Sequence, residues 1–316
     1  MIYDIRSRDF IILSFDKLVN IFADIVGYEN IKLNEPMKYH TSFKIGGPAD
    51  ILITPVSVEM LEKVLEICKS EGVPYFIMGN GTNLLVKDKG IRGVVVKTSG
   101  KLKNFIVNNN YIEAEAGLLL PELSKIACEN GLSGLEFASG IPGTLGGAIV
   151  MNAGAYGKEI KDVVIKTYYL TNEGELKIIT KEEHQFGYRT SIIQKQGGIV
   201  LKSIIKFDKE TREKILEKIK YFNAERRKSQ PIDMPSAGSV FKRPDNYHAA
   251  ALIEELGLKG FNIGGAQIST KHCGFIVNKG NATAKDVICV INHVQEKVKN
   301  AYGINLETEV KIVGEE

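Results

Sequence analysis

The chain has 316 residues, of which 44% are hydrophobic and 25% are charged, and its formal net charge is +3. These values are typical of a globular protein with two or three domains, and they argue against a disordered chain or a general nucleic-acid binder. No apolar run reaches the roughly 20 residues of a membrane-spanning helix, and the N-terminus lacks a signal-peptide pattern, so we expect a cytoplasmic protein. The four cysteines and five histidines are scattered, and no metal site is expected.

The amino-terminal part contains one amphipathic segment. Apolar residues recur at helical spacing between Phe10 and Tyr28, which predicts a helix, or two short ones, that ends near Gly27. We therefore expect residues 1–38 to form a helical extension ahead of the main body of the protein.

Residues 39–207 mix strand and helix patterns. A βαβ unit is expected first, with strands at residues 50–54 and 75–78 around a helix at residues 57–71. The remaining expected elements are a helix at residues 121–130 and strands at residues 94–97, 111–116, 163–170, 175–180 and 199–207. A turn signal at Thr171–Gly174 predicts a hairpin. This order predicts one α+β domain.

Residues 208–316 differ in composition and are expected to form a second, smaller α+β domain. The domain opens with a charged segment that predicts a surface helix ending before Pro231. The other expected elements are helices at residues 249–256 and from residue 283, and strands at residues 274–278 and 304–313. Thr283 and Asp286 have the spacing of a capping box at the start of the longer helix.

The stretch from Gly140 to Gly157, GIPGTLGGAIVMNAGAYG, has its glycines among small apolar residues, so we expect it to be ordered and buried. Glycine lets the backbone approach another surface closely. Two interpretations have similar weight from this stretch alone. It lines a large heterocyclic cofactor, or it is a glycine-rich turn that packs a helix against a sheet.

A second glycine motif, GNGTN at Gly79–Asn83, follows an expected strand. Successive NH groups in such a turn can form an anion-binding nest. The motif is not a G-x-G-x-x-G dinucleotide fingerprint, because Leu84 stands where a third glycine is required, and it is not a Walker A loop. Any phosphate here would be bound by backbone amides in a different architecture, although such a turn on its own is more often structural.

Three polar residues stand in short motifs: Arg189 in FGYRTS, Ser239 in AGSVF and Glu309 in LETEV. Considered singly, each is more often structural, as a surface arginine, a turn or cap serine, and an exposed carboxylate. Glu307 and Glu309 share the polar face of the last expected strand, and spacing does not distinguish them. The sequence contains no G-x-S-x-G and no H-E-x-x-H motif.

Taken together, six segments in this order resemble the UDP-N-acetylenolpyruvoylglucosamine reductases (UDP-N-acetylmuramate dehydrogenases), flavoenzymes of peptidoglycan precursor synthesis. The segments are HTSFKIGGPAD, GNGTNLLV, SGIPGTLGGAIVMNAGAYG, FGYRTS, AGSVFKRP and LETEV, and the resemblance extends from about Tyr39 to Val313. The chain is similar to the shorter class of the family, because no long insertion with a substrate-clamping tyrosine lies between Tyr156 and Arg189.

The resemblance implies an FAD-binding domain of the vanillyl-alcohol-oxidase type, made of two α+β subdomains at residues 39–207, and a substrate-binding domain at residues 208–316. It implies that NADPH reduces FAD and leaves, and that enolpyruvyl-UDP-N-acetylglucosamine then enters the same cleft. Hydride from the flavin N5 would convert this substrate to UDP-N-acetylmuramate. We expect a monomer without nucleic-acid or membrane partners.

The family's pattern also implies roles for individual residues. Arg189 would balance the developing enolate-like anion, Ser239 would donate a proton to carbon, and Glu309, rather than Glu307, would be the acidic partner. The expected UDP contacts are Arg226, Gln230, Lys242 and Arg243. The expected FAD contacts are Gly79, Asn80, Gly81, Thr82, Asn83, Gly140, Ile141, Pro142, Gly143, Gly146, Gly147, Ala148, Asn152 and Gly154.

Two other functions remain open from the sequence. One is a flavin oxidase of the same fold that oxidises an alcohol or sugar and passes electrons to oxygen or a quinone. It would share the glycine motifs but not AGSVF together with LETEV. The other is a non-catalytic nucleotide-sugar-binding module, which would carry no flavin.

Overall fold

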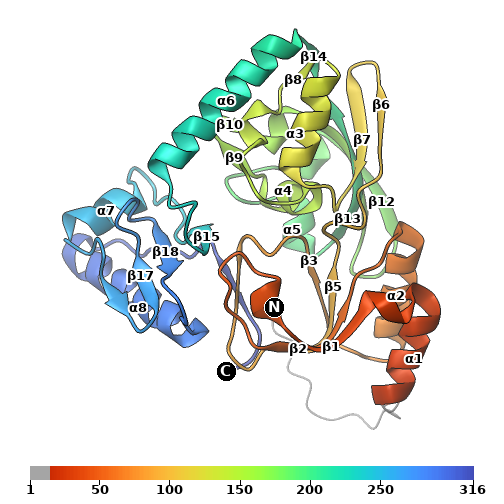
Figure 1. Cartoon of the computed structure of the whole chain (residues 1–316), viewed down its shortest axis with the longest axis horizontal. Helices are drawn as coiled ribbons and strands as arrows, with labels where there is room; N and C mark the ends of the chain where they lie inside the picture. The colour runs from red at the N-terminus through yellow and green to blue at the C-terminus, as the bar shows by residue number, and fades with distance from the viewer. Residues whose placement is uncertain (1–14) are drawn as a thin grey trace.

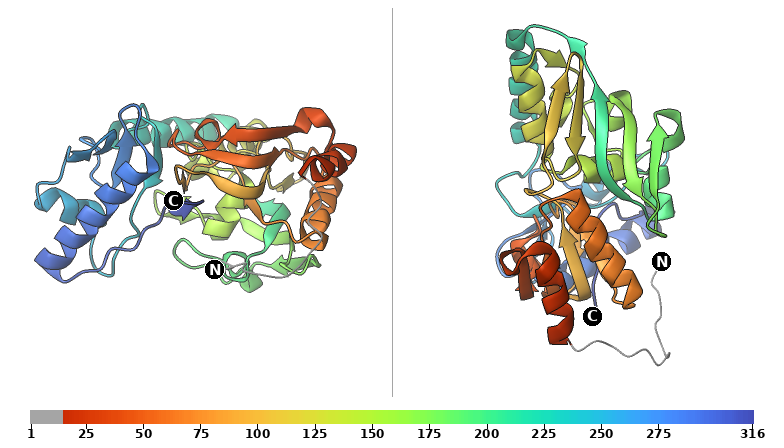
Figure 2. Two further views of the ribbon diagram at one scale, coloured as in Figure 1. Left: turned by 90° about the horizontal axis from the view of Figure 1, so that it is seen from below. Right: turned by 90° about the vertical axis from the view of Figure 1, so that its right-hand side faces the viewer.

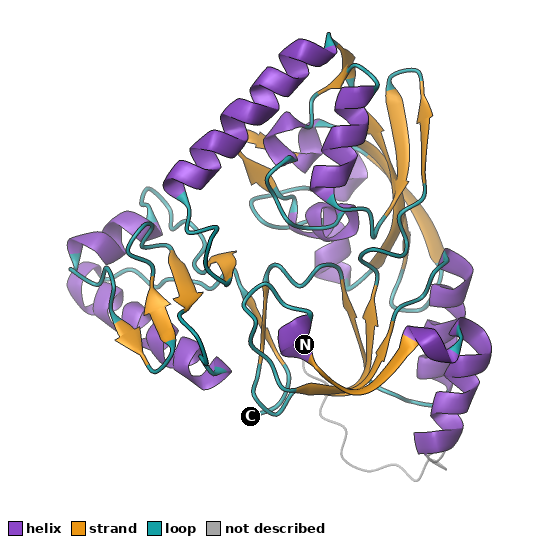
Figure 3. Cartoon of the chain, viewed as in Figure 1, coloured by secondary structure: helices purple, strands orange, loops and turns teal. Residues whose placement is uncertain are grey.

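The computed structural model describes residues 15–316. These residues form three lobes, each with its own sheet and helices (Figures 1 and 2). The long helix α6 (Arg212–Ser229) runs along the second lobe and leads into the third. Loops dominate the region where the three lobes face one another (Figure 3). This mixture of helices and strands agrees with the expected α+β class.

The first lobe is built on a four-stranded sheet in the order β1-β2-β5-β3. The elements of this lobe are α1 (Phe15–Val26), β1 (Ile31–Pro36), β2 (Pro48–Ile53), α2 (Val58–Ser70), β3 (Tyr75–Met78), β4 (Leu84–Val86) and β5 (Ile91–Lys97). Strands β2 and β3 both pair in parallel with β5, which lies between them. The expected βαβ unit is therefore present, with one strand inserted between its two strands.

Helix α1 belongs to this first lobe. Its buried residues Val19, Phe22 and Val26 pack in the same core as α2 and as Ile51 and Ile53 of β2. Strand β1 pairs with β2 and forms one edge of the sheet. Residues 15–38 are thus part of the lobe rather than a separate extension, and residues 10–14 of the expected helix lie outside the described residues.

The second lobe has a five-stranded antiparallel sheet in the order β12-β11-β13-β7-β6. The elements of this lobe are β6 (Phe105–Asn108), β7 (Tyr111–Glu115), α3 (Leu120–Glu129), β8 (Leu132–Ser133), α4 (Leu145–Met151), β9 (Gly154–Ala155), β10 (Lys158–Glu159), β11 (Val164–Leu170), β12 (Leu176–Thr180), α5 (Ile192–Gln196), β13 (Ile199–Lys206) and β14 (Asp208–Lys209). Helices α3 and α4 share a core with the sheet. The hairpin β11–β12 is confirmed, and the Thr171 hydroxyl accepts NH groups within its turn.

The third lobe contains β15 (Ser236–Ser239), α7 (Ala249–Glu255), β16 (Asn262–Ile263), β17 (Ala266–Ile268), β18 (Phe275–Asn278) and α8 (Ala284–Tyr302). The capping box of Thr283 and Asp286 is present at the start of α8. The core of this lobe also includes Phe43, Ile45 and Leu85 from the first lobe. The third lobe is therefore anchored on the first through apolar contacts.

The expected last strand is much shorter than the alternating pattern indicated. Only β19 (Lys311–Val313) joins a sheet, and it pairs in parallel with β4 of the first lobe. Burial alternates from residue 304 to residue 307, but Glu309 and Val310 are both largely buried, and residues 304–310 form only a single bridge, between Thr308 and Phe241. This segment passes between lobes and does not continue a sheet.

Candidate functional site

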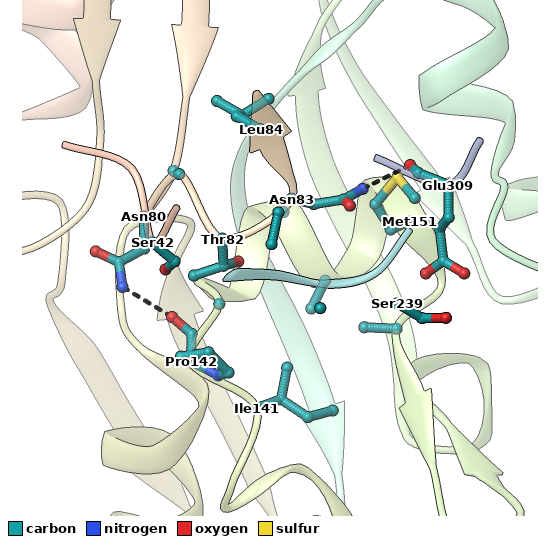
Figure 4. A pocket seen from close by; sticks show the side chains of 18 of the residues that line it. Ser42, Asn80, Thr82, Asn83, Leu84, Ile141, Pro142, Met151, Ser239 and Glu309 are labelled. Carbon is teal, nitrogen blue, oxygen red and sulfur yellow. Dashed lines mark hydrogen bonds between the residues drawn. The ribbon is translucent and has the colours of Figure 1, made fainter. Parts of the chain in front are cut away.

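A cleft of about 1400 Å³ lies between the three lobes. Its walls include the GNGTN loop and residues 76–78 from the first lobe, and residues 140–144 and 153–156 from the second. Residues 232–239 from the third lobe and the segment at Glu309 complete the walls (Figure 4). A pocket for one drug-sized ligand measures roughly 300–1000 Å³. This cleft is therefore larger than a pocket for one such ligand.

The GNGTN loop presents unused donors to the cleft. The main-chain NH groups of residues 80–83 donate to no group within residues 15–316. The side chains of the loop make the structural contacts instead, because Asn80 donates to the Pro142 carbonyl at 2.8 Å and Asn83 to the Glu309 carbonyl at 3.1 Å. A run of free NH groups in a turn is an anion-binding nest. This feature fits the diphosphate of FAD.

Glycine is required at Gly81 for a reason internal to the protein. Its φ is +64°, and a Cβ there would lie 2.1 Å from the His40 carbonyl oxygen. Residues 40–42 thus pack directly against the loop, and Ser42 NH also donates to the Gly81 carbonyl at 3.1 Å. The shape of the nest therefore depends on the close approach of these two backbone segments.

Part of the glycine-rich stretch packs α4 against the sheet, and part of it lines the cleft. Gly146 packs α4 against the sheet, because a Cβ at this position would lie 2.8 Å from the Ala116 Cβ. Gly143 and Gly147 have side-chain atoms no nearer than 3.4 Å to such a Cβ, and both line the cleft. The expected residues of this stretch that line the cleft are Gly140, Ile141, Pro142, Gly143, Gly146, Gly147, Ala148 and Gly154.

Asn152 is the one expected FAD contact that does not line the cleft. It ends α4 in the left-handed conformation and is fully buried. Its amide donates to the Gly187 carbonyl at 3.0 Å and to Glu159 at 3.1 Å, and its oxygen accepts from Lys161 NH at 3.1 Å. Asn152 therefore fastens the end of α4 to the turn that carries Arg189.

Arg189 occupies a turn whose backbone favours glycine. The main-chain NH of Gly187 donates to the Thr190 carbonyl, and the NH of Thr190 donates to the Gly187 carbonyl. Arg189, within this two-residue turn, has φ of +53°. A turn with positive φ only at its third position is usually filled by glycine or asparagine. The turn directs the guanidinium into the cleft, where Nε donates to Glu309 Oε1 at 2.8 Å.

Glu309 is largely buried, in contrast to the exposed position that was expected. Its side chain is 13% exposed, whereas that of Glu307 is 74% exposed and pairs with Lys242 at 2.9 Å. Burial raises the pKa of the Glu309 carboxyl, although the nearby charge of Arg189 opposes this. The structure thus separates two glutamates that spacing alone could not.

Ser239 lies on the same side of the cleft as Glu309 (Figure 4). The two are linked through Val240, whose carbonyl accepts from Glu309 NH at 2.7 Å. The Ser239 hydroxyl donates weakly to the Phe241 carbonyl at 3.4 Å. Arg189, Ser239 and Glu309, which come from two lobes and the C-terminal segment, therefore all line this cleft.

The expected UDP contacts separate into two groups. Arg226, Gln230 and Arg243 line the cleft. Lys242 does not line it, and its ammonium pairs with Glu307 on the surface instead. The basic residues of the lining are Lys44, Arg189, Arg226, Arg227, Arg243 and Lys311, and its acidic residues are Asp233 and Glu309. This excess of positive charge suits an anionic ligand.

Several further residues of the cleft wall were not expected from the sequence. His272 lies in the loop before β18, and its Nδ1 accepts from Gly274 NH at 3.1 Å, so its proton is on Nε2. Tyr156 stacks on Phe222 with ring centroids 4.7 Å apart. Only Tyr156 had a signal, because it stands inside the glycine-rich stretch. His272 is brought to the cleft by the fold of the third lobe.

Among residues 15–316 no helix has the length and apolar character of a membrane span. The same part of the chain contains no cluster of three His, Cys, Asp or Glu residues that could hold a metal ion.

Comparison with known proteins connects this site to one family. Residues 49–180 match the family model of an FAD binding domain, and residues 230–313 match that of the UDP-N-acetylenolpyruvoylglucosamine reductase C-terminal domain. The fold is therefore an FAD-binding domain of the vanillyl-alcohol-oxidase type followed by that C-terminal domain. The first family model ends within the second lobe, and the second begins at the end of α6.

Several similar proteins share one name, and each matches this chain along nearly its whole length. The chain is 51% identical to UDP-N-acetylenolpyruvoylglucosamine reductase of Clostridium tetani over 95% of this chain and 97% of that protein. It is 52% identical to that of Caldanaerobacter subterraneus subsp. tengcongensis over 94% and 98%. The crystal structure of the enzyme from Thermus caldophilus has a TM-score of 0.76 and 36% identity, and the match covers 89% of this chain and 97% of that one. The chain belongs to the UDP-N-acetylenolpyruvoylglucosamine reductase family.

Proposed function

We propose that this chain reduces the enolpyruvyl ether of UDP-N-acetylglucosamine to UDP-N-acetylmuramate, with FAD as its cofactor and NADPH as the hydride donor. The observation that supports this proposal is that one cleft is lined by both sets of residues. Free NH groups of residues 80–83 line it together with Arg189, Ser239 and Glu309. The cleft volume of about 1400 Å³ supports successive binding of NADPH and the substrate beside the cofactor.

In this proposal the two glycine motifs hold FAD. The NH groups of residues 80–83 would hold its diphosphate, and residues 140–148 would contribute to the binding of its ring system. Bound FAD would supply the transfer of hydride from NADPH to the substrate. Asn152 contributes from outside the cleft by holding the turn that carries Arg189.

The catalytic side chains act on the substrate anion. Arg189 balances the negative charge that develops on the carboxylate and the adjacent carbon, because a guanidinium held in advance costs little reorganisation. Glu309 fixes its orientation by accepting Nε–H at 2.8 Å. Nη2 makes a long hydrogen bond of 3.5 Å to the Gly154 carbonyl, and Nη1 donates to no group within residues 15–316, so it can meet the substrate. The Ser239 hydroxyl donates a proton to the carbon next to the carboxylate. A group of high pKa can do this because the carbanion is far more basic.

The remaining parts of the proposal concern the nucleotide and the cell. Arg226 and Arg243 bind the UDP part of the substrate from the cleft wall, supported by the excess of positive charge there. We propose a monomer that acts in the cytoplasm, where NADPH and nucleotide sugars are available.

Measurement of the two half-reactions tests the proposal. NADPH should bleach the flavin absorbance anaerobically, and enolpyruvyl-UDP-N-acetylglucosamine should then restore it. Ser239→Ala should leave bleaching within a few-fold of wild type and slow reoxidation by about 10²–10⁴-fold, because only the second step needs the proton. Reoxidation by oxygen alone would favour an oxidase. Equal slowing of both steps would remove Ser239 from the mechanism.

A further inference from the structure

The end of α6 presents Arg226 and Gln230 to the cleft. The two residues are one helical turn apart, and Gln230 NH donates to the Arg226 carbonyl at 2.9 Å. Pro231 follows, and the chain then enters the third lobe. Residues four apart lie on the same side of a helix. A ligand at this end of the cleft would therefore meet both side chains.

Gln230 has an unpaired acceptor. Its Oε1 is buried and has no hydrogen-bond partner, and within residues 15–316 it is the one buried side-chain nitrogen or oxygen of which this is true. Native proteins pair nearly all such atoms, because an unpaired buried acceptor costs free energy. Since Gln230 lines the cleft, a bound ligand can supply the missing donor.

Arg226 has the opposite requirement. Within residues 15–316 its guanidinium forms no ion pair, and burial lowers its pKa. Its Cδ would lie 2.9 Å from a Cβ placed on Gly140, so the side chain lies against the glycine-rich wall. A guanidinium without a carboxylate partner is suited to bind a phosphate group in two-point fashion.

A diphosphate satisfies only one of these two groups. Its ionised oxygens accept hydrogen bonds from Arg226 but have no donor to give to Gln230 Oε1. We propose that Gln230 Oε1 accepts a hydrogen bond from a donor of the nucleotide sugar next to the phosphates, a hydroxyl or amide N–H, which the diphosphate itself cannot supply. This inference rests on the proposed function and specifies the group that Gln230, an expected UDP contact, would recognise.

A pair of substitutions tests whether Gln230 faces a hydrogen-bond donor or a phosphate group of the ligand. Gln230→Glu keeps the acceptor but adds a negative charge, whereas Gln230→Met keeps the shape and removes the acceptor. Lys228→Gln is the matched control, because it changes the net charge equally from an exposed position outside the cleft lining. The dissociation constants of UDP and UDP-N-acetylglucosamine are measured on the oxidised FAD-bound protein by calorimetry. Retention of flavin absorbance shows that each variant is folded.

We expect Gln230→Met to raise the dissociation constant of UDP-N-acetylglucosamine by about tenfold, which corresponds to the loss of one buried hydrogen bond. The dissociation constant of Gln230→Glu should stay within about threefold of the wild-type value, and that of Lys228→Gln within about twofold. Weaker binding of UDP as well would place the donor in the uridine part, on a ribose hydroxyl or the uracil N3–H, and weaker binding of UDP-N-acetylglucosamine alone would place it in the sugar. Either result supports the inference.

Two results would overturn the inference. A loss of more than about 100-fold with Gln230→Glu would mean that the side chain faces phosphate, since like charges in a poorly hydrated site repel strongly. Wild-type affinity in Gln230→Met would mean that the acceptor faces no ligand. Failure of the proposed function has a different signature, because wild-type protein would then bind neither UDP nor UDP-N-acetylglucosamine, and the inference would fall with it.

Discussion

Glu309→Gln tests whether the ion pair with Arg189 stabilises the fold or serves the chemistry. At 2.8 Å and an effective dielectric constant of about 20, the attraction between the two charges is about 6 kcal/mol, from 332 divided by the product of dielectric constant and distance. Removing each charge from water costs several kcal/mol. Because the pKa of Glu309 is raised despite Arg189, the cost of burying this carboxylate exceeds the attraction.

We therefore expect Glu309→Gln to leave the free energy of unfolding at pH 8 unchanged or to raise it by up to about 1 kcal/mol. Glutamine has nearly the same shape, and its oxygen can still accept from Arg189 Nε. The pH dependence has a definite sign. The pKa of Glu309 in the folded state lies above the ordinary value of 4.5. The contribution of this group to the stability of the wild type is therefore fully present below pH 4.5 and is lost as the pH rises through the folded-state pKa. The relative stability of the variant should increase with pH over that window.

Urea unfolding followed by circular dichroism at several pH values above 4 measures this difference, since the chain has no tryptophan to report on unfolding. Glu307→Gln is the control. That carboxylate is exposed, and its hydrogen bond to Lys242 lowers its pKa, so its effect on stability has the opposite pH trend. Destabilisation of Glu309→Gln by about 3 kcal/mol or more at pH 8, as for breakage of a stabilising buried pair, would refute the reasoning.

Three further predictions concern residues around the cleft. Gly81→Ala should lose most of its FAD, because its Cβ would meet the His40 carbonyl at 2.1 Å, whereas Gly100→Ala, with φ of +82° but no atom within 4 Å, should keep flavin content normal. Asn152→Ala should lower the free energy of unfolding by about 1–3 kcal/mol, because its hydrogen-bond partners are left unpaired. It should slow reoxidation of the flavin by the substrate while flavin content changes less, and a normal rate of reoxidation would contradict its link to Arg189. Burial lowers the pKa of His184, so wild-type stability should fall as pH drops from 6.5 through the folded pKa, and His184→Gln should show a smaller fall in melting temperature. Equal falls in the two proteins would show that His184 does not titrate on unfolding.

Elements with local end signals could be predicted from the sequence almost to the residue. The helix expected at residues 57–71 is α2, with the Ser57 hydroxyl accepting from Met60 NH at its start. The capping box of Thr283 and Asp286 likewise marks the start of α8. These signals act over three or four residues, so they are present in the sequence itself.

Features that depend on distant contacts could not be predicted in this way. Strand β1 was not predicted because its alternation of apolar and polar residues covers only residues 31–34 and ends at Glu35 and Pro36. It is an edge strand whose central residues are exposed, and its pairing with β2 is a tertiary contact. The resemblance to a family selected Glu309 over Glu307, but only the fold shows why the two differ. One packs between lobes against Arg189, and the other extends from the surface.

The segment from Glu309 to Lys311 joins all three lobes at the cleft. Its carbonyl at Glu309 accepts from Asn83 and its NH at Lys311 donates to the Asn83 carbonyl, which connects it to the end of the anion nest. The NH of Glu309 bonds to Val240 beside Ser239, and its carboxylate bonds to Arg189 of the second lobe. A shift of any lobe relative to the others would therefore alter a contact of this segment. This position explains why a carboxylate that costs stability would be retained at this point of the chain, since an apolar residue could pack here but could not orient the guanidinium.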